Sequence, residues 1–220
     1  MKWSFGIITA GDHTDRVQRL VDSIDAQNIP LDNYEIIVVG RTTAITSNVT
    51  VRHLPFDDTE RRGWITRKKN MVTDVARYDN ICYLHDYLAL DKDWYKGFKK
   101  FGKFDVAVSR MLNNNGHRYR DYCACPDGTQ DKKLLVPYDV AVDSKHLYVS
   151  GAYWVAKKKV MQDVRLNEDL VAGQGEDIEW SKRMRDKYKL SFNPYSVVHL
   201  CLFHRPVFTL MDRDAAEKMK

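Results

Sequence analysis

The sequence predicts an α/β fold with a mostly parallel central sheet flanked by helices. In the first half of the chain, short apolar runs alternate with segments of helical periodicity, and the connections are short. Strand-helix-strand order of this kind is typical of a parallel sheet covered by helices. The 220 residues contain no repeat, low-complexity linker or charge block. We therefore expect a single domain over residues 1–210, followed by a tail or linker over 211–220.

The elements of the first half follow from local patterns. Runs rich in β-branched residues, or alternating between apolar and polar, predict strands. Such runs stand at 3–10, 34–40, 48–55 and 80–84. Apolar residues at spacings of three and four predict helices at 15–24 and 60–78. The expected buried side of the second helix consists of Ile65, Met71, Val72, Val75 and Ala76.

The second half is less regular. A short helix is expected at 94–101 and a strand at 104–111, and residues 112–133 are rich in turn signals such as Asn-Gly and Asp-Gly. Further along the chain we expect a strand running into a helix at 147–161, a helix starting near Glu176, and a last strand within 190–204.

Composition excludes several classes of protein. No stretch approaches the ~20 apolar residues that span a bilayer, and the N-terminus lacks the pattern of a signal peptide. A cytoplasmic location is therefore the default expectation. The net charge of +5 suits a ligand that carries phosphate, but it is weaker than the basic face of a nucleic-acid binder. The basic run at 67–69 is expected to be a solvated helix face.

The cysteines predict no metal site. Cys82 and Cys201 lie in apolar runs, and Cys123 and Cys125 form a C-x-C with no second pair nearby. Since buried free cysteines are common in cytosolic proteins, we expect four reduced, structural thiols.

Polar residues gather where the predicted strands end. In parallel sheets, ligands bind at the carboxyl ends of the strands, and this rule brings 9–12, 40–42 and 85–87 to one rim. Asp86 offers a hard oxygen ligand for Mg²⁺ or Mn²⁺, and His85 offers an imidazole. A structural explanation, in which Asp86 caps the next turn, is equally compatible with the residues. For His199, inside an apolar strand, a core role is favoured over metal binding.

The segment "GQGEDIEW" (173–180) is the most informative. Two glycines allow close approach to a ligand, and Glu176 and Asp177 then open a helix. Taken alone, the segment favours ordinary first-turn charges that interact with the helix dipole, with a general base as the alternative. Around Gly151, the aromatic residues would suit a sugar-binding surface, although strand core is the commoner cause. A solvated hairpin accounts for Arg118, Arg120 and Asp121.

Taken together and in order, these pieces resemble a GT-A glycosyltransferase of the inverting family 2 type, over about residues 3–200. "TAGDHTDR" (9–16) stands where that family holds the nucleotide, "TRKKNMV" (66–72) resembles its basic-Asn pair, and "YLHDYLAL" (83–90) replaces its Asp-x-Asp. "YVSGAYWVAKKKV" (148–160) resembles the acceptor side, and "GEDIEW" (175–180) the Glu-Asp pair with the base.

The resemblance implies a set of site residues. Those implied to bind the donor nucleotide are Thr9, Ala10, Gly11, Asp12, Arg16, Gly40, Arg67, Lys69, Asn70, His85 and Asp86. Those implied on the acceptor side are Gly151, Tyr153, Trp154, Gly175 and Trp180. The catalytic pair would be Asp177 as base, with Glu176 positioning the acceptor.

Two departures from the family pattern stand out. His85 and Tyr87 replace the outer aspartates, so a metal would be bound by Asp86 with His85 or His199. Gly40 stands where an acidic residue often contacts the nucleotide.

The implied reaction moves a sugar from a nucleotide-diphosphate donor to an acceptor hydroxyl, with inversion and with Mn²⁺ or Mg²⁺ on the diphosphate. A loop over 163–175 would close over the reacting centre. Two other functions remain open: a nucleotidyltransferase, which typically has a more basic, glycine-rich first loop, and a non-catalytic nucleotide- or carbohydrate-binding module.

Overall fold

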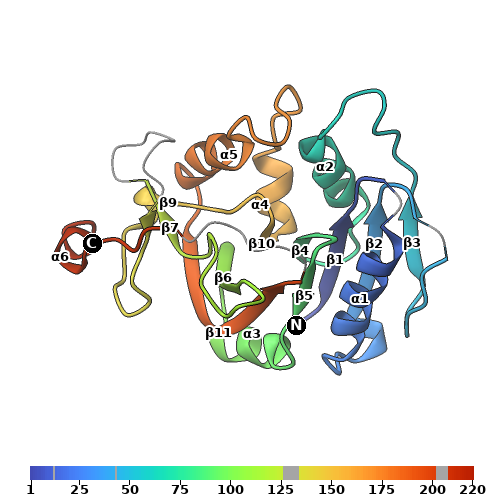
Figure 1. Ribbon diagram of the computed structural model, residues 1–220, viewed down its shortest axis with the longest axis horizontal. Coiled ribbons are helices and arrows are strands. Elements are labelled where there is room, and N and C mark those ends of the chain that lie inside the picture. Colours follow the sequence, from blue (N-terminus) through green and yellow to red (C-terminus); the bar gives the residue numbers. More distant parts are fainter. Residues whose placement is uncertain (12, 43, 126–133, 202–207) are drawn as a thin grey trace.

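The computed structural model describes residues 1–11, 13–42, 44–125, 134–201 and 208–220. Within these ranges, a curled sheet of eight strands forms the centre of the molecule (Figure 1). Its strand order is β3-β2-β1-β4-β10-β6-β11-β5. The strands are β1 (Trp3–Ile8), β2 (Tyr34–Val39), β3 (Val51–Leu54), β4 (Asn80–His85), β5 (Leu88–Leu90), β6 (Val106–Leu112), β10 (Tyr153–Lys157) and β11 (Leu190–Leu200).

The pairing of the strands confirms the predicted fold class. Strands β3, β2, β1 and β4 form a parallel block, and β6 and β11 are also parallel to each other. Strand β10 joins the two parts by pairing antiparallel with both β4 and β6, and β5 pairs antiparallel with β11 at the edge. The sheet is therefore mixed but mostly parallel.

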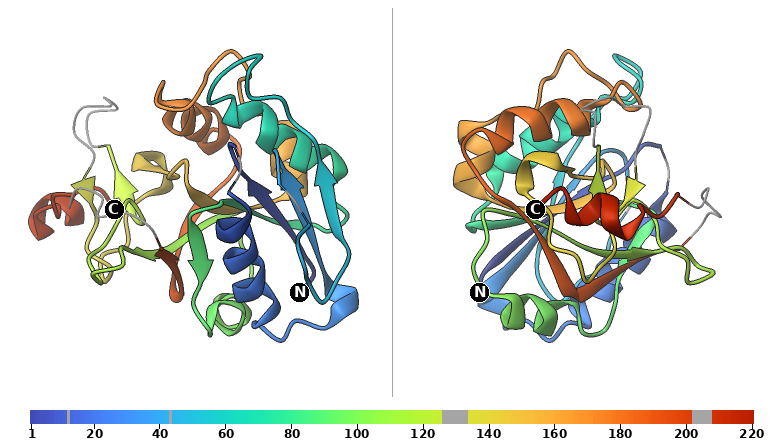
Figure 2. Two further views of the ribbon diagram at one scale, coloured as in Figure 1. Left: turned by 45° about the vertical axis from the view of Figure 1, so that its right-hand side comes forward. Right: turned by 90° about the vertical axis from the view of Figure 1, so that its left-hand side faces the viewer.

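Helices cover both faces of the sheet (Figures 1 and 2). They are α1 (Thr14–Asp25), α2 (Ile65–Val75), α3 (Trp94–Phe101), α4 (Lys158–Asp163) and α5 (Glu176–Arg185). Helix α6 (Arg213–Glu217) lies apart from them, at the far left of Figure 1. Because successive strand residues point to opposite faces, the sheet supplies two separate cores. Helices α1 and α3 pack into one together with Trp3 and Phe5, and α2, α4 and α5 pack into the other together with Ile37 and Val39.

Helix α2 differs from its predicted form. It spans Ile65–Val75 rather than 60–78, and of the five residues expected to be buried, Val72 and Ala76 are fully so. The basic run was expected to be solvated, which is wrong for Lys68 and Lys69, whose exposed fractions are 2% and 1%. The helix packs directly against β1 at Gly6. No larger residue fits there, since a Cβ at Gly6 would be 2.3 Å from a methyl of Val72.

The turn-rich stretch contributes a second, small sheet. Its order is β8-β7-β9, with β7 (Cys123–Ala124), β8 (Leu134–Leu135) and β9 (Leu147–Tyr148). Residues 211–220, expected to be a tail or linker, contain helix α6, and Met211, Ala216 and Met219 are buried. The four cysteines are free thiols. None of the helices in the described part of the chain is long and apolar enough to cross a membrane.

Candidate functional site

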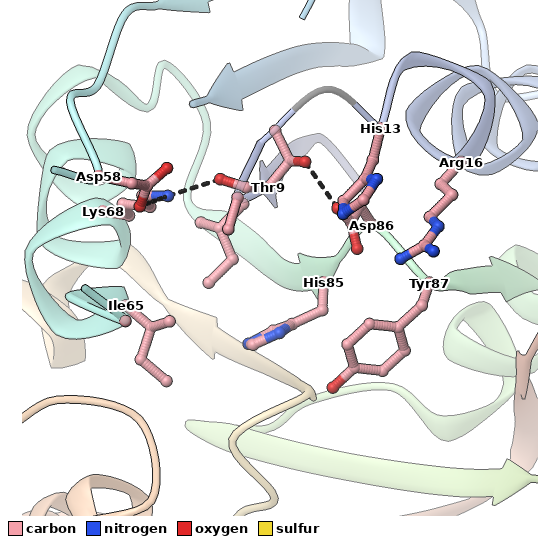
Figure 3. Close-up of a pocket in the computed structure, with 12 residues that line it drawn as sticks. Thr9, His13, Arg16, Asp58, Ile65, Lys68, His85, Asp86 and Tyr87 are labelled. Carbon is pink, nitrogen blue, oxygen red and sulfur yellow. Dashed lines mark hydrogen bonds and ion pairs between the residues drawn. The ribbon is translucent and has the colours of Figure 1, made fainter. Parts of the chain in front are cut away.

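The ends of β1 and β4 lie side by side and position the residues expected at the rim of the sheet. In the parallel register Ile8 is opposite His85, so the residues that follow each strand meet at the same edge. Thr9 Oγ1 donates a 2.6 Å hydrogen bond to Asp86 Oδ2, and the backbone N–H of Asp86 donates to the carbonyl of Ile8. The buried carboxylate of Asp86 is thereby fixed between the two strand ends (Figure 3).

A hollow of about 270 Å³ opens around Asp86, and we call it the first hollow. Basic side chains lie around Asp86: His13 and Arg16 come from the start of α1, and Lys68 comes from α2 (Figure 3). A second carboxylate, Asp58, also lines this hollow. The first hollow is lined by Ile8, Thr9, Ala10, His13, Arg16, Asp58, Gly63, Ile65, Lys68, His85, Asp86 and Tyr87.

Opposing effects act on the charge of Asp86. Burial raises the pKa of Asp86, whereas the hydrogen bond from Thr9 and the positive charges of His13, Arg16 and Lys68 lower it, and the net direction is upward. The charged form of this carboxylate is therefore less favourable here than in water.

Lys68 is anchored within the wall of the first hollow. Its Nζ donates a 2.5 Å hydrogen bond to the carbonyl of Thr9 and forms a 2.6 Å ion pair with Asp58, and it lies 4.9 Å from the ring centroid of Phe56. These contacts hold a cation beside the loop that follows β1.

A second hollow, also of about 270 Å³, adjoins the first and shares Ile65, His85 and Tyr87 with it. Its other walls are the turn before β10, the start of α5 and the segment before β7. They comprise Tyr119, Arg120, Ser150, Gly151, Ala152, Ala172, Gly173, Gly175, Glu176 and Asp177.

Two carboxylates define the chemistry of the second hollow. Asp177 is held in a fixed orientation, because Oδ2 accepts a 3.0 Å hydrogen bond from the N–H of Gly151 and Oδ1 accepts one of 2.9 Å from the N–H of Ile178. Burial, followed by the adjacent charge of Asp177, raises the pKa of Glu176. Gly175 precedes the pair in a left-handed conformation, with φ of 75°, which glycine adopts without strain.

Gly151 allows the chain to pass close to both carboxylates. A Cβ at this position would be 3.0 Å from Glu176 Oε1 and 3.5 Å from Asp177 Oδ2. The absence of a side chain at Gly151 is therefore a condition for the present arrangement of the acidic pair.

Lys69 supports the acidic pair from within the protein. Its Nζ donates a 2.6 Å hydrogen bond to the carbonyl of Gly151 and lies 4.1 Å from the ring centroid of Trp154. Burial lowers the pKa of Lys69 to about 7, although the charges of Glu176 and Asp177 act in the opposite direction. Lys69 thus lies behind the second hollow and lines neither hollow.

The three residues expected to bind a metal are not gathered at one point. His199 Nε2 lies 3.1 Å from Asp91 Oδ2, and no cluster of three or more His, Cys, Asp or Glu ligands is found in the described residues. Asp86 and His85 both line the first hollow. Since Mg²⁺ and Mn²⁺ often bind one or two protein ligands together with phosphate oxygens and water, these two residues fit a metal that binds with a diphosphate.

Other expected site residues have structural contacts away from the hollows. Arg67 and Asn70 both hydrogen bond to the side chain of Glu168, and Asn70 also bonds to the backbone of Leu166. Gly40 has no room for a side chain, since a Cβ there would be 2.5 Å from the carbonyl oxygen of Thr9. Asp12 lies outside the described residues.

The aromatic residues expected on the acceptor side lie in the core instead. Tyr153 is buried and its hydroxyl contacts Trp94 Nε1 and Ser109. Trp154 and Trp180 are fully buried and stack on each other at 5.6 Å. Core packing explains their presence in this segment.

Several residues of the hollows were not singled out from the sequence. His13, Asp58 and Lys68 line the first hollow, and Arg120 lines the second. A charged run on a helix usually indicates solvent exposure, so the burial of Lys68 had no local signal. For Arg120, the sequence favoured a solvated hairpin.

Comparisons with known proteins complete this description. No protein-family model matches the sequence, and no curated protein shows significant similarity to it. Solved structures do match. S. aureus TarS is 17% identical, with a TM-score of 0.64 over 90% of this chain and 36% of that chain. The structure of S. aureus TarS 1-349 in complex with UDP is 15% identical, with a TM-score of 0.59 over 90% of this chain and 60% of that one.

GalNAc-T7, solved with UDP, GalNAc and Mn²⁺, is 14% identical, with a TM-score of 0.68 over 94% of this chain and 45% of that one. The chain therefore spans only part of each of these proteins. TarS and GalNAc-T7 are GT-A-type glycosyltransferases, and the predicted resemblance is confirmed at the level of the fold. With its curled, mostly parallel sheet and its helices on both faces, the chain has the GT-A fold.

Proposed function

We propose that the chain is a glycosyltransferase that moves a sugar from a nucleotide-diphosphate donor to an acceptor hydroxyl, with inversion. The observation that carries the proposal is that the two hollows meet at Ile65, His85 and Tyr87. One is lined by basic groups suited to a diphosphate, and the other by carboxylates suited to proton removal. The UDP in two of the similar solved structures supports this assignment.

The donor diphosphate would occupy the first hollow. As the sugar leaves, negative charge develops on the diphosphate. Arg16 and Lys68, which line this hollow, would stabilise that charge electrostatically. Lys68 is preorganised by its bonds to Thr9 and Asp58, so little reorganisation is needed. The loop that follows β1 would contact the nucleotide through Thr9 and Ala10.

A divalent cation fits this site together with the donor. Asp86 and His85 would be its protein ligands, and the metal would supply further stabilisation of charge on the diphosphate. Thr9 holds Asp86 in position through a hydrogen bond to Oδ2, so Oδ1 is the oxygen that would bind the cation. The Mn²⁺ in the GalNAc-T7 structure is consistent with such a requirement.

The acceptor would bind in the second hollow. Asp177 would accept the proton of the attacking hydroxyl, since its carboxylate is fixed by two backbone N–H groups and lines this hollow. Glu176 would orient the acceptor. Attack from the second hollow on a donor held in the first would put nucleophile and leaving group on opposite sides of the sugar carbon, as inversion requires.

Donor cleavage provides the test. The chain is incubated with UDP-glucose, UDP-N-acetylglucosamine, UDP-galactose, GDP-mannose and dTDP-glucose, each with and without Mn²⁺, and the products are separated. Release of nucleoside diphosphate supports the proposal. With pyrophosphate added, formation of a nucleoside triphosphate and a sugar 1-phosphate would indicate a nucleotidyltransferase. Nucleotide binding without any product would indicate a binding module.

A test variant and a matched control variant, each changing one aspartate to asparagine, accompany this experiment. Asp177→Asn removes the proposed base from the second hollow, whereas Asp186→Asn changes an exposed aspartate at the end of the same helix. Loss of activity in the first and retention in the second would tie the activity to the second hollow. Equal activity in both variants would overturn the assignment of Asp177.

A further inference from the structure

Arg120 in the second hollow has features that the proposed transfer reaction does not explain. It follows β6 in the segment leading to β7, and its backbone φ is +32°. Left-handed backbone is unfavourable for a residue with a side chain. In the described residues, Asn28 is the other non-glycine with positive φ, and asparagine tolerates that region better. The strain at Arg120 is retained next to the acidic pair.

The side chain of Arg120 is oriented by aromatic rings rather than by an acid. Its guanidinium carbon lies 4.6 Å from the ring centroid of Phe208 and 5.8 Å from that of Tyr119. Nε is buried and makes no hydrogen bond within the described residues, and no ion pair to Arg120 is found there. A guanidinium stacked on a ring keeps its in-plane N–H donors available for a planar anion.

Arg118, two residues earlier, differs from Arg120 in that its guanidinium is paired with an acid. Its Nη2 and Nε bind Asp121 Oδ1 at 2.8 and 3.2 Å, and Nη2 also donates to the carbonyl of Val136. Arg118 therefore serves the local structure, and its charge is already compensated. Arg120 has no such compensation in the described part of the chain.

The charges of the second hollow determine which ligand Arg120 suits. Glu176 and Asp177 would repel a negatively charged substrate, and Arg120 is the cation among the residues that line this hollow. We propose that Arg120 binds an anionic group, a phosphate or a carboxylate, that the acceptor carries close to the hydroxyl to be glycosylated. This inference rests on the proposed function and names the class of acceptor.

The donor diphosphate is a second possible source of an anion, and the geometry disfavours it. The first hollow has its own basic groups, Arg16 and Lys68, whereas Arg120 lines the second hollow together with the proposed base. An anion bound at Arg120 is therefore expected to be additional to the diphosphate.

Binding of small probes tests the proposal. The chain, with and without saturating UDP and Mn²⁺, is titrated with glycerol 3-phosphate and with glycerol, and binding is followed by calorimetry. Glycerol 3-phosphate is expected to bind at least ~10-fold more tightly than glycerol, since hydrogen bonds to charged groups are the stronger ones. Equal binding of the two probes would overturn the proposal.

Three variants of Arg120 separate anion binding from folding. Arg120→Gln and Arg120→Gly should each weaken glycerol 3-phosphate binding about 10-fold, and Arg120→Lys should retain part of it. Arg120→Gly relieves the positive φ, so its melting temperature should equal or exceed that of the wild type. The control is Arg213→Gln, because Arg213 pairs with Asp139 on an exposed surface and lines neither hollow.

The outcomes also distinguish this inference from the proposed function. If the Arg120 variants bind UDP more weakly and glycerol 3-phosphate unchanged, the anion is the donor diphosphate and the inference fails. If glycerol 3-phosphate binds through Arg120 but no nucleotide binds and no donor is cleaved, the anion site stands and the proposed function falls. Loss of probe binding in Arg213→Gln would overturn the assignment to Arg120.

Discussion

Thr9 and Asp86, 77 residues apart in sequence, are joined by a buried 2.6 Å hydrogen bond at the adjoining ends of β1 and β4. Thr9→Val would leave the buried carboxylate without this donor. We expect the variant to lose about 1–3 kcal/mol of unfolding free energy and to bind UDP more weakly. Urea unfolding and calorimetry measure both effects.

The control for that change is Thr59→Val, which removes a similar hydroxyl bond to the exposed Asp57. Its effect on the unfolding free energy should stay within about 0.5 kcal/mol. If the two valine variants lost the same unfolding free energy, the Thr9–Asp86 bond would contribute no more to stability than an exposed one.

Metal dependence should disappear when Asp86 is changed. We expect Asp86→Asn to bind UDP equally well with Mn²⁺ and with EDTA, whereas the wild type should bind more tightly with Mn²⁺. Asn retains the size of the side chain but is a weaker ligand for a hard cation. A wild-type affinity that does not respond to Mn²⁺ would remove the metal from the proposal, and Arg16 and Lys68 would then neutralise the diphosphate.

Turnover should separate the two carboxylates of the second hollow. Asp177→Asn should lower kcat ~100-fold or more, the usual contribution of a general base, with little change in UDP affinity. Glu176→Gln should mainly raise KM for the acceptor. The reverse pattern, with Glu176→Gln abolishing kcat and Asp177→Asn nearly active, would exchange their roles.

The burial of Lys69 is expected to make the free energy of unfolding depend on pH. Its pKa is lowered from 10.5 to about 7 on folding, so between these values the unfolded chain binds a proton that the folded chain does not. The unfolding free energy should therefore rise with pH over this window, by up to about 1 kcal/mol per pH unit. Below pH 7 both states are protonated and the contribution is constant.

Urea unfolding at pH 7, 8 and 9 measures this slope. Lys69→Met should flatten it relative to the wild type, whereas Lys96→Met, which changes an exposed lysine paired with Asp93, should leave it unchanged. A wild-type slope that persists in Lys69→Met would show that another group causes it.

The sequence predicted most of the large elements but not the burial of charge between them. Strands β1, β2 and β4 and helices α1 and α3 lie where periodicity placed them, because each buries a regular apolar side. The paired two-residue strands β7, β8 and β9 carry no periodic signal. Lys68 and Lys69 were misjudged because they are buried by contacts far away in the sequence. Lys68 bonds to Thr9, and Lys69 bonds to Gly151.

For the candidate site, the rule that ligands bind at the carboxyl ends of parallel strands located the rim around Thr9 and Asp86. The positions of single side chains depended on long-range packing. Trp154 and Trp180 fill the core, and Arg120 acquires its place from the stacking on Phe208, contacts that local sequence does not encode.

Side chains of α2 and of Trp64 just before it also hold the loop that precedes α5, by hydrogen bonds to its backbone carbonyls. Trp64 Nε1 donates to the backbone carbonyl of Glu168, Thr66 Oγ1 to that of Leu170, and Asn70 Nδ2 to that of Leu166. Any closing movement of the expected loop over 163–175 would therefore concern its last residues, near Gly173 and Gly175.

Because these donors bind main-chain oxygens, the path of residues 169–172 depends little on which side chains they carry. Glu168 differs, since its own side chain binds Arg67 and Asn70. A library that varies residues 169–172 while leaving α2 intact would change the wall of the second hollow without moving it. The lining of the second hollow at this loop can therefore vary at small cost to folding.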